Sequence, residues 1–282
     1  MCQFCNEHGE GKKWYLQAKN YSDDLLSDAR RRKFIAEFAG AGVEKLSKDV
    51  AGLKKLARLP ALIRGLLVRF VTWKMKKVHF GQVVPIEEIE QIFGFVNSIT
   101  RVSCVCRRVS LGKEKRYCYG ISLEPDGGEF ARICAGVERS YADGPHLPGM
   151  ERLNREQAME AFRQHEKEGL CHTVWTFHTP FIAGICNCDR SDCLAMRSTV
   201  TNGVSVMFRA EWLARVDPQK CTGCRQCMRL CQFGALTFSA GSSKVAVDER
   251  RCYGCGICRS ACAPNAIRLE DRRSDAVASG LW

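Results

Sequence analysis

Two stretches near the C-terminal end carry four cysteines each at one common spacing, CTGCRQCMRLC at residues 221–231 and CYGCGICRSAC at residues 252–262. Each cysteine of the first stretch returns 31 residues later. The flanking residues repeat as well, since residues 216–217 match 247–248 and residues 234–238 match 265–269. The region is therefore an internal repeat, and each half predicts a strand, a cysteine loop, a short helix and a second strand.

The spacing of these cysteines is typical of iron–sulfur ligands. In two-cluster proteins three cysteines of each run bind one cluster, and the fourth binds the other. We expect one [4Fe–4S] cluster at Cys221, Cys224, Cys227 and Cys262, and a second at Cys252, Cys255, Cys258 and Cys231. Gly223, Gly254 and Gly256 permit the positive φ values that such tight loops need. Zinc sites favour paired Cys-x2-Cys units, and disulfides belong to oxidising compartments, so the spacing favours iron–sulfur clusters.

From about residue 209 to residue 271 the chain resembles the bacterial two-[4Fe–4S] ferredoxins. The resemblance implies low-potential transfer of single electrons between redox enzymes. Ferredoxins usually have a proline directly after the fourth cysteine, whereas here Gln232 follows Cys231 and Ala263 precedes Pro264. This departure removes no ligand, but it affects the geometry of the loop.

The chain is much longer than the ferredoxin-like part. Its 282 residues predict an α+β protein of three regions. These are a helical basic N-terminal region at 1–84, an α+β cysteine-rich domain at 85–207 and the ferredoxin-like domain at 208–282. We find no glycine-rich fingerprint for a nucleotide, so no cofactor beyond metal clusters is expected.

Composition limits the partners and the compartment. Eighteen cysteines without an export signal favour a reducing cytoplasm and an anaerobic redox system. The net charge of +12 would steer the protein toward redox partners with an acidic docking surface. No nucleic-acid motif accompanies the dispersed basic residues, so no nucleic-acid partner is expected. Arginine or lysine interrupts every long apolar stretch, which argues against a transmembrane segment.

The N-terminal region predicts two helices. Apolar residues recur at helical spacing over residues 21–59, with Ser22 as the N-cap, and Pro60 breaks the pattern. Residues 61–78 form a second helical pattern in which Leu62, Leu66, Phe70 and Trp73 share a stripe among basic residues. Such a helix either packs on its own core or lies on a membrane surface, and we favour packing while leaving peripheral membrane contact open.

The first residues hold a fragment of a metal motif. Cys2, Cys5 and His8 stand three residues apart. They supply only three ligands, so a metal would need another from elsewhere in the chain. A terminus without metal is the alternative.

A second group of cysteines lies in the middle of the chain. Cys104-Val105-Cys106 alternates like a strand, as does Cys186-Asn187-Cys188, so each pair is expected to place both thiols on one face. The possible third metal site comprises Cys104, Cys106, Cys118, Cys186, Cys188 and Cys193. Six cysteines exceed the four that one cluster needs, which leaves the ligand set open. Cys134 and Cys171 are interpreted as buried thiols.

Helix and strand patterns surround these cysteines and support a folded domain. A helix is expected at residues 85–98, and a capping box of Asn154 and Gln157 opens another that Gly169 ends. Residues 170–177 have the composition of a strand. Among the histidines only His172 and His178 are candidates for a ligand or an acid.

Three functions fit the whole pattern. The first is an electron carrier or a subunit of an oxidoreductase complex, with two clusters and a candidate third in the middle domain. The second is an iron–sulfur oxidoreductase whose middle cysteines form the active centre. The third is a redox sensor that switches on cluster loss, which the dispersed charge supports least.

Overall fold

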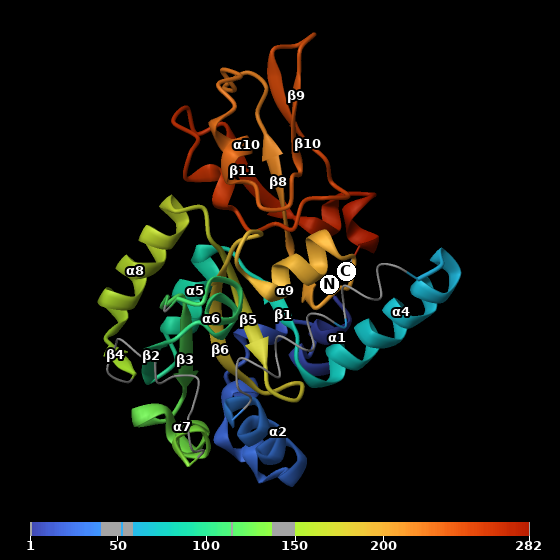
Figure 1. Cartoon of the computed structure of the whole chain (residues 1–282). Coiled ribbons are helices and arrows are strands. Elements are labelled where there is room, and N and C mark those ends of the chain that lie inside the picture. The colour runs from blue at the N-terminus through green and yellow to red at the C-terminus, as the bar shows by residue number, and fades with distance from the viewer. Residues whose placement is uncertain (1, 41–51, 53–58, 114, 137–149, 282) are drawn as a thin grey trace.

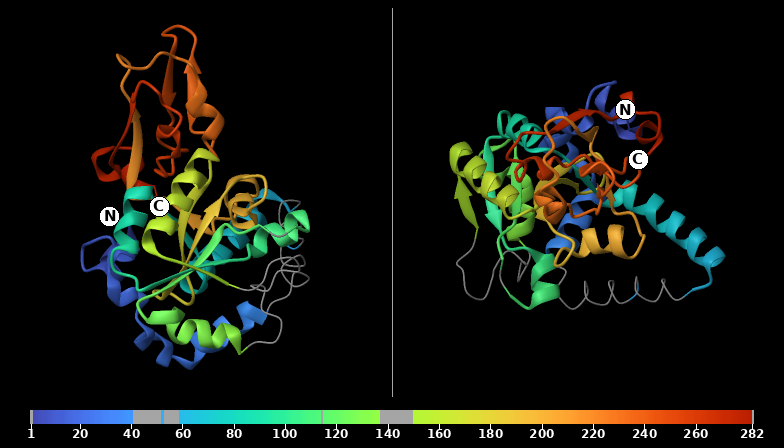
Figure 2. Two further views of the ribbon diagram at one scale, coloured as in Figure 1. Left: turned by 90° about the vertical axis from the view of Figure 1, so that its left-hand side faces the viewer. Right: turned by 90° about the horizontal axis from the view of Figure 1, so that it is seen from above.

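The computed structural model describes residues 2–40, 52, 59–113, 115–136 and 150–281 (Figure 1). It is an α+β structure in which a large sheet carries helices on both faces and a smaller C-terminal part projects from one end (Figures 1 and 2). The helices are α1 Gln3–Gly9, α2 Ala29–Gly40, α4 Ala61–Val78, α5 Ile86–Phe93, α6 Val105–Leu111, α7 Gly128–Ala135, α8 Arg155–Lys167, α9 Leu194–Met196 and α10 Gln226–Leu230.

The large sheet has seven strands in the order β4-β2-β3-β6-β5-β1-β7. Their bounds are β1 Gly81–Val83, β2 Ser98–Val102, β3 Cys118–Ser122, β4 Glu151–Leu153, β5 Cys171–Thr176, β6 Ile182–Cys188 and β7 Met207–Phe208. All neighbours pair antiparallel except β1 and β7, which are parallel. We name the sheet and its helices the sheet domain.

Each face of the sheet builds a separate core, because successive side chains of a strand point to opposite faces. Val174 joins one core, with residues of α1, α5 and α8. Its neighbour Trp175 joins the other, with residues of α2, α7 and α9. The second core also contains several of the middle cysteines, so the face beneath α2 and α7 is the one that positions them.

The N-terminal residues belong to this sheet domain rather than to a region of their own. Phe4, Trp14 and Tyr15 are buried in the same core as Phe80 and Ile89. The expected boundary at residue 84 is therefore wrong, since β1 itself pairs with β5 in the middle of the sheet. Helical spacing at the start of the chain did not reveal this contact, because it connects residues about 70 positions apart.

The structure corrects some expected helices and confirms others. The capping box is present, with the Asn154 side chain accepting from the Gln157 N–H at 2.8 Å, and α8 follows it. The helix expected at 85–98 ends at Phe93, and Ser98 already begins β2. In the helix expected at 21–59, a 3-10 helix at Asp23–Ser27 precedes α2. Residues 41–58, apart from Gly52, lie outside the described residues.

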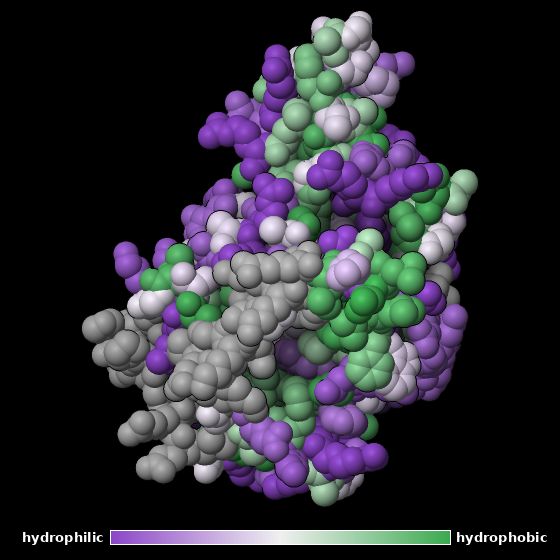
Figure 3. Space-filling view, turned by 45° about the vertical axis from the view of Figure 1, so that its right-hand side comes forward, coloured by the Kyte–Doolittle hydropathy of each residue, from purple (hydrophilic) through white to green (hydrophobic). Residues whose placement is uncertain are grey.

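Helix α4 covers residues 61–78 as expected, but it packs along one edge only. Val68, Val71 and Met75 pack against the second core. The opposite face is exposed, with Leu62 at 83%, Leu66 at 64% and Phe70 at 59%. Figure 3 shows these apolar side chains gathered on the surface. Among the described residues, no helix combines the length and the apolar character needed to cross a bilayer.

The C-terminal part, residues 212–271, has the repeat that the sequence predicts. Strand β8 Trp212–Val216 pairs with β11 Ile267–Asp271, and β9 Leu236–Ser239 pairs with β10 Lys244–Val247. Equivalent hydrogen bonds close both halves, from the Asp217 N–H to the Ala266 carbonyl and from the Asp248 N–H to the Ala235 carbonyl, each at 2.7 Å. The short helix is α10 in the first half but only a 3-10 turn, Ile257–Arg259, in the second.

Candidate functional site

The eight C-terminal cysteines lie near one another on the two loops of the repeat. Burial, and next the thiols of Cys262, Cys224 and Cys221, raise the pKa of Cys227 to about 11. Burial, and next the thiols of Cys255, Cys252 and Cys231, raise the pKa of Cys258. Cys262 lines one hollow with Cys221, Cys224 and Cys227. Cys231 and Cys227 of the first run are both among the thiols that raise the pKa of Cys258.

Backbone N–H groups orient the fourth cysteine in both halves. The Ala235 N–H donates to the Cys231 sulfur and the Ala266 N–H to the Cys262 sulfur, both at 3.2 Å. A donor held against sulfur stabilises the thiolate, which is the form that binds metal. The two contacts are 31 residues apart in the chain and equal in length. The internal repeat therefore includes the hydrogen bond to the fourth cysteine sulfur.

Glycine is required at one position of each cysteine loop. Gly223 and Gly254 both have φ of +70°. A Cβ on Gly223 would lie 2.2 Å from the Ser243 carbonyl oxygen, and one on Gly254 would lie 2.0 Å from the Trp212 carbonyl oxygen. The sequence predicted these glycines for positive φ. The structure adds that backbone fills the space of a side chain, from the turn before β10 at Gly223 and from β8 at Gly254.

This donor set fits iron–sulfur clusters. Cys221, Cys224, Cys227 and Cys262 face one small hollow, and backbone N–H groups supply hydrogen bonds to sulfur beside it. The residues described in the C-terminal part thus offer thiols, space and donors together. A resident cluster would supply one-electron chemistry, while the chain fixes the ligands.

A comparison with known families matches residues 220–266 to the 4Fe-4S dicluster domain. The C-terminal part is a ferredoxin-type iron–sulfur domain. It supports a role in iron–sulfur electron transfer. No curated protein matches the chain. The match does not include the middle cysteines, so the support for a metal site there is the geometry of the sheet domain.

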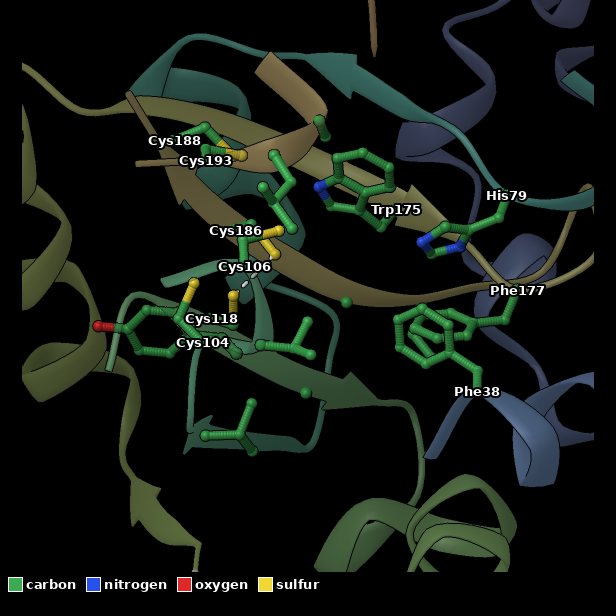
Figure 4. A pocket seen from close by; sticks show the side chains of 18 of the residues that line it. Phe38, His79, Cys104, Cys106, Cys118, Trp175, Phe177, Cys186, Cys188 and Cys193 are labelled. Carbon is green, nitrogen blue, oxygen red and sulfur yellow. Dashed lines mark hydrogen bonds between the residues drawn. The ribbon is translucent and has the colours of Figure 1, made fainter. Parts of the chain in front are cut away.

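All six middle cysteines line one cavity of the sheet domain (Figure 4). Their thiols form a chain of contacts from Cys186 through Cys118, Cys104, Cys106 and Cys193 to Cys188. The Cys186 and Cys118 sulfurs are 3.1 Å apart, because the two residues are partners in the register of β3 and β6. The group that the sequence selected thus gathers at one place in the fold.

The strand expected at residues 104–106 is wrong. Strand β2 ends at Val102, Cys104 is the N-cap of α6, and Cys106 lies on that helix. Three residues are too few to distinguish alternation from a helix start. Both thiols still reach the cavity, because the start of α6 lies over it. Cys186 and Cys188 lie on β6 as expected and share a face.

One buried cation compensates negative charge beside these thiols. Arg107 is 2% exposed, donates to the Cys104 sulfur at 3.5 Å and forms an ion pair with Asp189. The thiols of Cys106 and Cys118, and then Arg107, hold the pKa of Cys104 well below its usual range. A thiol with a lowered pKa is more readily deprotonated, and the thiolate is the form that binds metal.

The spacing of the middle sulfurs distinguishes one ion from a cluster. A tetrahedral zinc site with bonds of about 2.3 Å sets its sulfurs about 3.8 Å apart. Within the described parts of the chain, no three of these six sulfurs all lie within 4.8 Å of one another. They form an open chain around a hollow, an arrangement that suits a cluster of several irons better than a single ion.

Cys171 joins the two cysteine regions, a position that no pattern in the sequence indicated. It is the register partner of Cys188 on β5 and β6, and its thiol lies against Cys255 of the C-terminal domain. The contact with Cys171 lowers the pKa of Cys255. The interpretation of Cys171 as a buried thiol is right as far as burial goes, but its position is between two candidate metal sites.

The two candidate histidines point elsewhere. His172 lies on the opposite face of β5 from Cys171, with its Nδ1 2.6 Å from the Asn187 Oδ1. His178 is in a turn at positive φ. Neither is among the residues that line the cavity.

His79, which the sequence did not single out, lines the cavity at its other end. Its ring centroid is 4.8 Å from Phe38, 5.0 Å from Trp175 and 5.2 Å from Phe177 (Figure 4). Its Nδ1–H donates to the Thr176 carbonyl, so Nε2 is left as an acceptor. Burial lowers the pKa of His79 to about 4, which keeps the ring neutral near pH 7.

The cavity itself is large and mostly apolar, with a volume of about 650 Å³. Aromatic and aliphatic side chains from α2, α4, α7 and β5 surround it between His79 and the cysteines. Cavities of this size and character usually hold a small organic molecule. The sheet domain thus combines a candidate metal site and a candidate ligand site in one space.

Proposed function

We propose that the protein relays single electrons through three iron–sulfur clusters. Two [4Fe–4S] clusters lie in the C-terminal domain, at the ligand sets expected from the sequence. Four of the six middle cysteines hold the third. The observation that supports the proposal is the position of Cys171, which pairs with Cys188 across β5 and β6 and shares one core with Cys255.

A continuous row of cysteines supports this proposed course of the electrons through the protein. From the middle group it passes Cys188 and Cys171, reaches Cys255 and its set, and continues to the set of Cys227. The far end of the row reaches the surface, since Cys224 is the only exposed cysteine among all 18. An electron would leave or enter at Cys224.

The surface at that end favours an acidic partner protein. Lys220, Arg225 and Arg229 are exposed beside Cys224. Positive charge around the exit steers an acidic surface toward it and shortens the distance for transfer. The net charge of +12 adds a long-range component of the same sign.

We further propose that α4 contacts an anionic membrane surface. Its exposed face carries Leu62, Leu66, Phe70 and Trp73, with lysine and arginine on either side and no acidic residue between Ala61 and Val78. An amphipathic helix of this composition binds at the boundary of headgroups and acyl chains. Charge complementarity therefore favours an anionic bilayer over a second copy of this basic chain.

Iron counting tests the third cluster. Protein purified without oxygen should contain about twelve irons per chain, against about eight for the C-terminal clusters alone. Single replacement by serine of the six middle cysteines should lower the count by about four at four positions and leave it unchanged at two. Cys134→Ser is the matched control, since Cys134 lines the same cavity outside the chain of thiols. Eight irons in the unaltered protein would refute the proposal.

The apolar cavity favours a second candidate function, an oxidoreductase whose middle cluster acts on an aromatic substrate. A substrate hydroxyl would donate to the His79 Nε2 while its ring lies among Phe38, Trp175 and Phe177. Calorimetry should show that 1-naphthol binds about tenfold more tightly than 1-methoxynaphthalene, which has no hydroxyl to donate. In His79→Phe the two should bind equally, and absence of binding by both would reject this candidate.

A further inference from the structure

The N-terminal metal fragment finds a further ligand at the start of the C-terminal domain. Cys2 and Cys5 lie together with Glu211, which is about 200 residues away and directly precedes β8. Their ligand atoms all lie within 4.8 Å of one another. Among the described His, Cys, Asp and Glu residues, no other three are so close.

Two distances within this group are close to the edges of one tetrahedral site. The Cys2 and Cys5 sulfurs are 3.4 Å apart, and the Cys5 sulfur is 3.6 Å from the Glu211 Oε1. Zinc bonds of about 2.3 Å to sulfur and about 2.0 Å to oxygen require edges of about 3.8 Å and about 3.5 Å. This compact triangle differs from the open row of the six middle cysteines, which suits a larger group.

The residues around the triangle fix the carboxylate in place. The Cys2 backbone N–H donates to the Glu211 Oε1 at 2.9 Å. Arg272 donates to the Oε2 at 3.3 Å, and its other N–H groups bond the carbonyls of Ala210 and Ala278. Partners of this kind, which orient a ligand from behind, are a regular part of metal sites.

Burial and charge agree with a bound dication. Cys2 is 2% exposed, Cys5 0% and Glu211 2%. Two thiolates and one carboxylate bring three negative charges, which one divalent ion and the Arg272 guanidinium neutralise. Buried charges that are balanced in this way avoid the cost of desolvation without a partner.

His8, the third residue of the motif, is outside the group. Its Nε2 is 3.9 Å from Glu7 and its ring stacks on Phe4. The motif therefore provides two ligands, and the fold replaces the expected histidine with a carboxylate from a distant segment.

We propose that Cys2, Cys5 and Glu211 bind one zinc ion, with a water molecule in the fourth position. Both thiols lose their protons to solvent as the two Zn–S bonds form, and the ion stays divalent throughout. The site joins the start of α1 to the residue that precedes β8, so it holds the sheet domain and the C-terminal domain together. It goes beyond the proposed electron relay, which does not require it.

Zinc content and X-ray absorption at the zinc edge test this site in the iron-loaded protein. Expression with added zinc should give about one zinc per chain, with two sulfurs at about 2.3 Å and two oxygens at about 2.0–2.2 Å. Four sulfur neighbours would mean that zinc occupies a cluster site, and less than a tenth of an equivalent would mean that the three residues form hydrogen bonds only. Either result overturns the inference.

Two variants separate this site from the clusters. Glu211→Gln keeps the size of the side chain and an acceptor for the Cys2 N–H, and it should lower zinc content at least tenfold with iron unchanged. His8→Ala is the control and should retain all zinc. If Glu211→Gln fails to fold, Cys5→Ser provides the same measurement, because it exchanges one sulfur for an oxygen and leaves the other core side chains of α1 in place. Unchanged zinc in these ligand variants refutes the site, whereas low iron with normal zinc refutes the relay alone.

Discussion

The two cysteine regions of this protein reach their geometry by different routes. The eight C-terminal cysteines lie within residues 221–262, on two loops of a repeat whose halves complete each other. The six middle cysteines are spread over residues 104–193. They meet because β3 pairs with β6, which aligns Cys118 with Cys186, and because the starts of α6 and α9 lie at the same cavity. Local spacing defines the first region, and long-range strand pairing and helix packing define the second.

This difference determines what damages each region. Close backbone contacts hold the C-terminal loops, which have only a small core of their own. The middle cysteines are part of a large core that includes residues of α2, α7 and α9. A change in one loop should therefore disturb the C-terminal clusters without reaching the middle cavity, and changes in the sheet domain should have the opposite effect.

Gly254→Ala should have the largest effect. The new Cβ would lie 2.0 Å from the Trp212 carbonyl, and the residue would keep a φ of +70°. We expect a loss of at least about 3 kcal/mol in the stability of the C-terminal domain. Iron analysis should show the C-terminal clusters lost and the middle iron kept. Gly241→Ala, where no atom lies within 4 Å of the new Cβ, is the control. Equal iron in both variants would contradict the account.

Replacement of Leu66 and Phe70 by glutamate should abolish membrane binding by α4. The two exposed side chains should contribute about 3–6 kcal/mol together, so affinity for anionic vesicles should fall more than a hundredfold. Flotation with phosphatidylserine vesicles measures this. Leu111→Glu, at another exposed apolar position, should bind like the unaltered protein. A protein that sediments as a dimer and ignores vesicles would instead assign the face to a second copy.

Mild acid should destabilise the sheet domain and spare the C-terminal domain. Burial lowers the pKa of His79 from 6.5 to about 4 and that of His165 from 6.5 to about 3. The unfolded chain therefore binds protons that the folded chain excludes, and stability falls as pH decreases from about 6.5 toward about 4. Above pH 6.5 this effect is absent. No histidine follows His178, so the C-terminal domain does not lose stability through protonation of a buried histidine.

Urea unfolding at pH 7 and pH 5 measures the difference. Fluorescence of Trp14 and Trp175 reports on the sheet domain, and cluster absorbance reports mainly on the C-terminal domain. The fluorescence midpoint should be lower at pH 5, and His165→Gln should reduce the shift. Identical midpoints at both pH values would show that these histidines do not control stability.

Asn154→Ala should have the smallest effect. It removes the side-chain oxygen that accepts the Gln157 N–H at the start of α8. Loss of an N-cap costs about 1 kcal/mol, so the melting temperature of the sheet domain should fall by a few degrees. The iron content should not change. Gln157→Ala keeps the Asn154 acceptor and should lower the melting temperature less. An equal decrease would mean that the bond from the Asn154 N–H to the Gln157 side chain provides the stabilisation.

The sequence predicted the C-terminal domain in most of its detail. Its repeat, ligand spacing and required glycines are all local patterns, and the family match at residues 220–266 supports an iron–sulfur domain at this place. Capping and apolar spacing likewise located α8 and α4. The strand predicted at Cys104 and Cys106 was wrong, because a helix start and a strand share the same three-residue pattern.

Composition and spacing alone determined that this chain carries an iron–sulfur domain and a second set of six cysteines, because metal ligands must be particular residue types at particular intervals. Only the tertiary structure decided how the sets are connected. Cys171 lies against Cys255, His79 closes the cavity, and Glu211 joins Cys2 and Cys5. These contacts link residues about 80 to 210 positions apart along the chain, and they depend on strand register and domain packing, which no local pattern encodes.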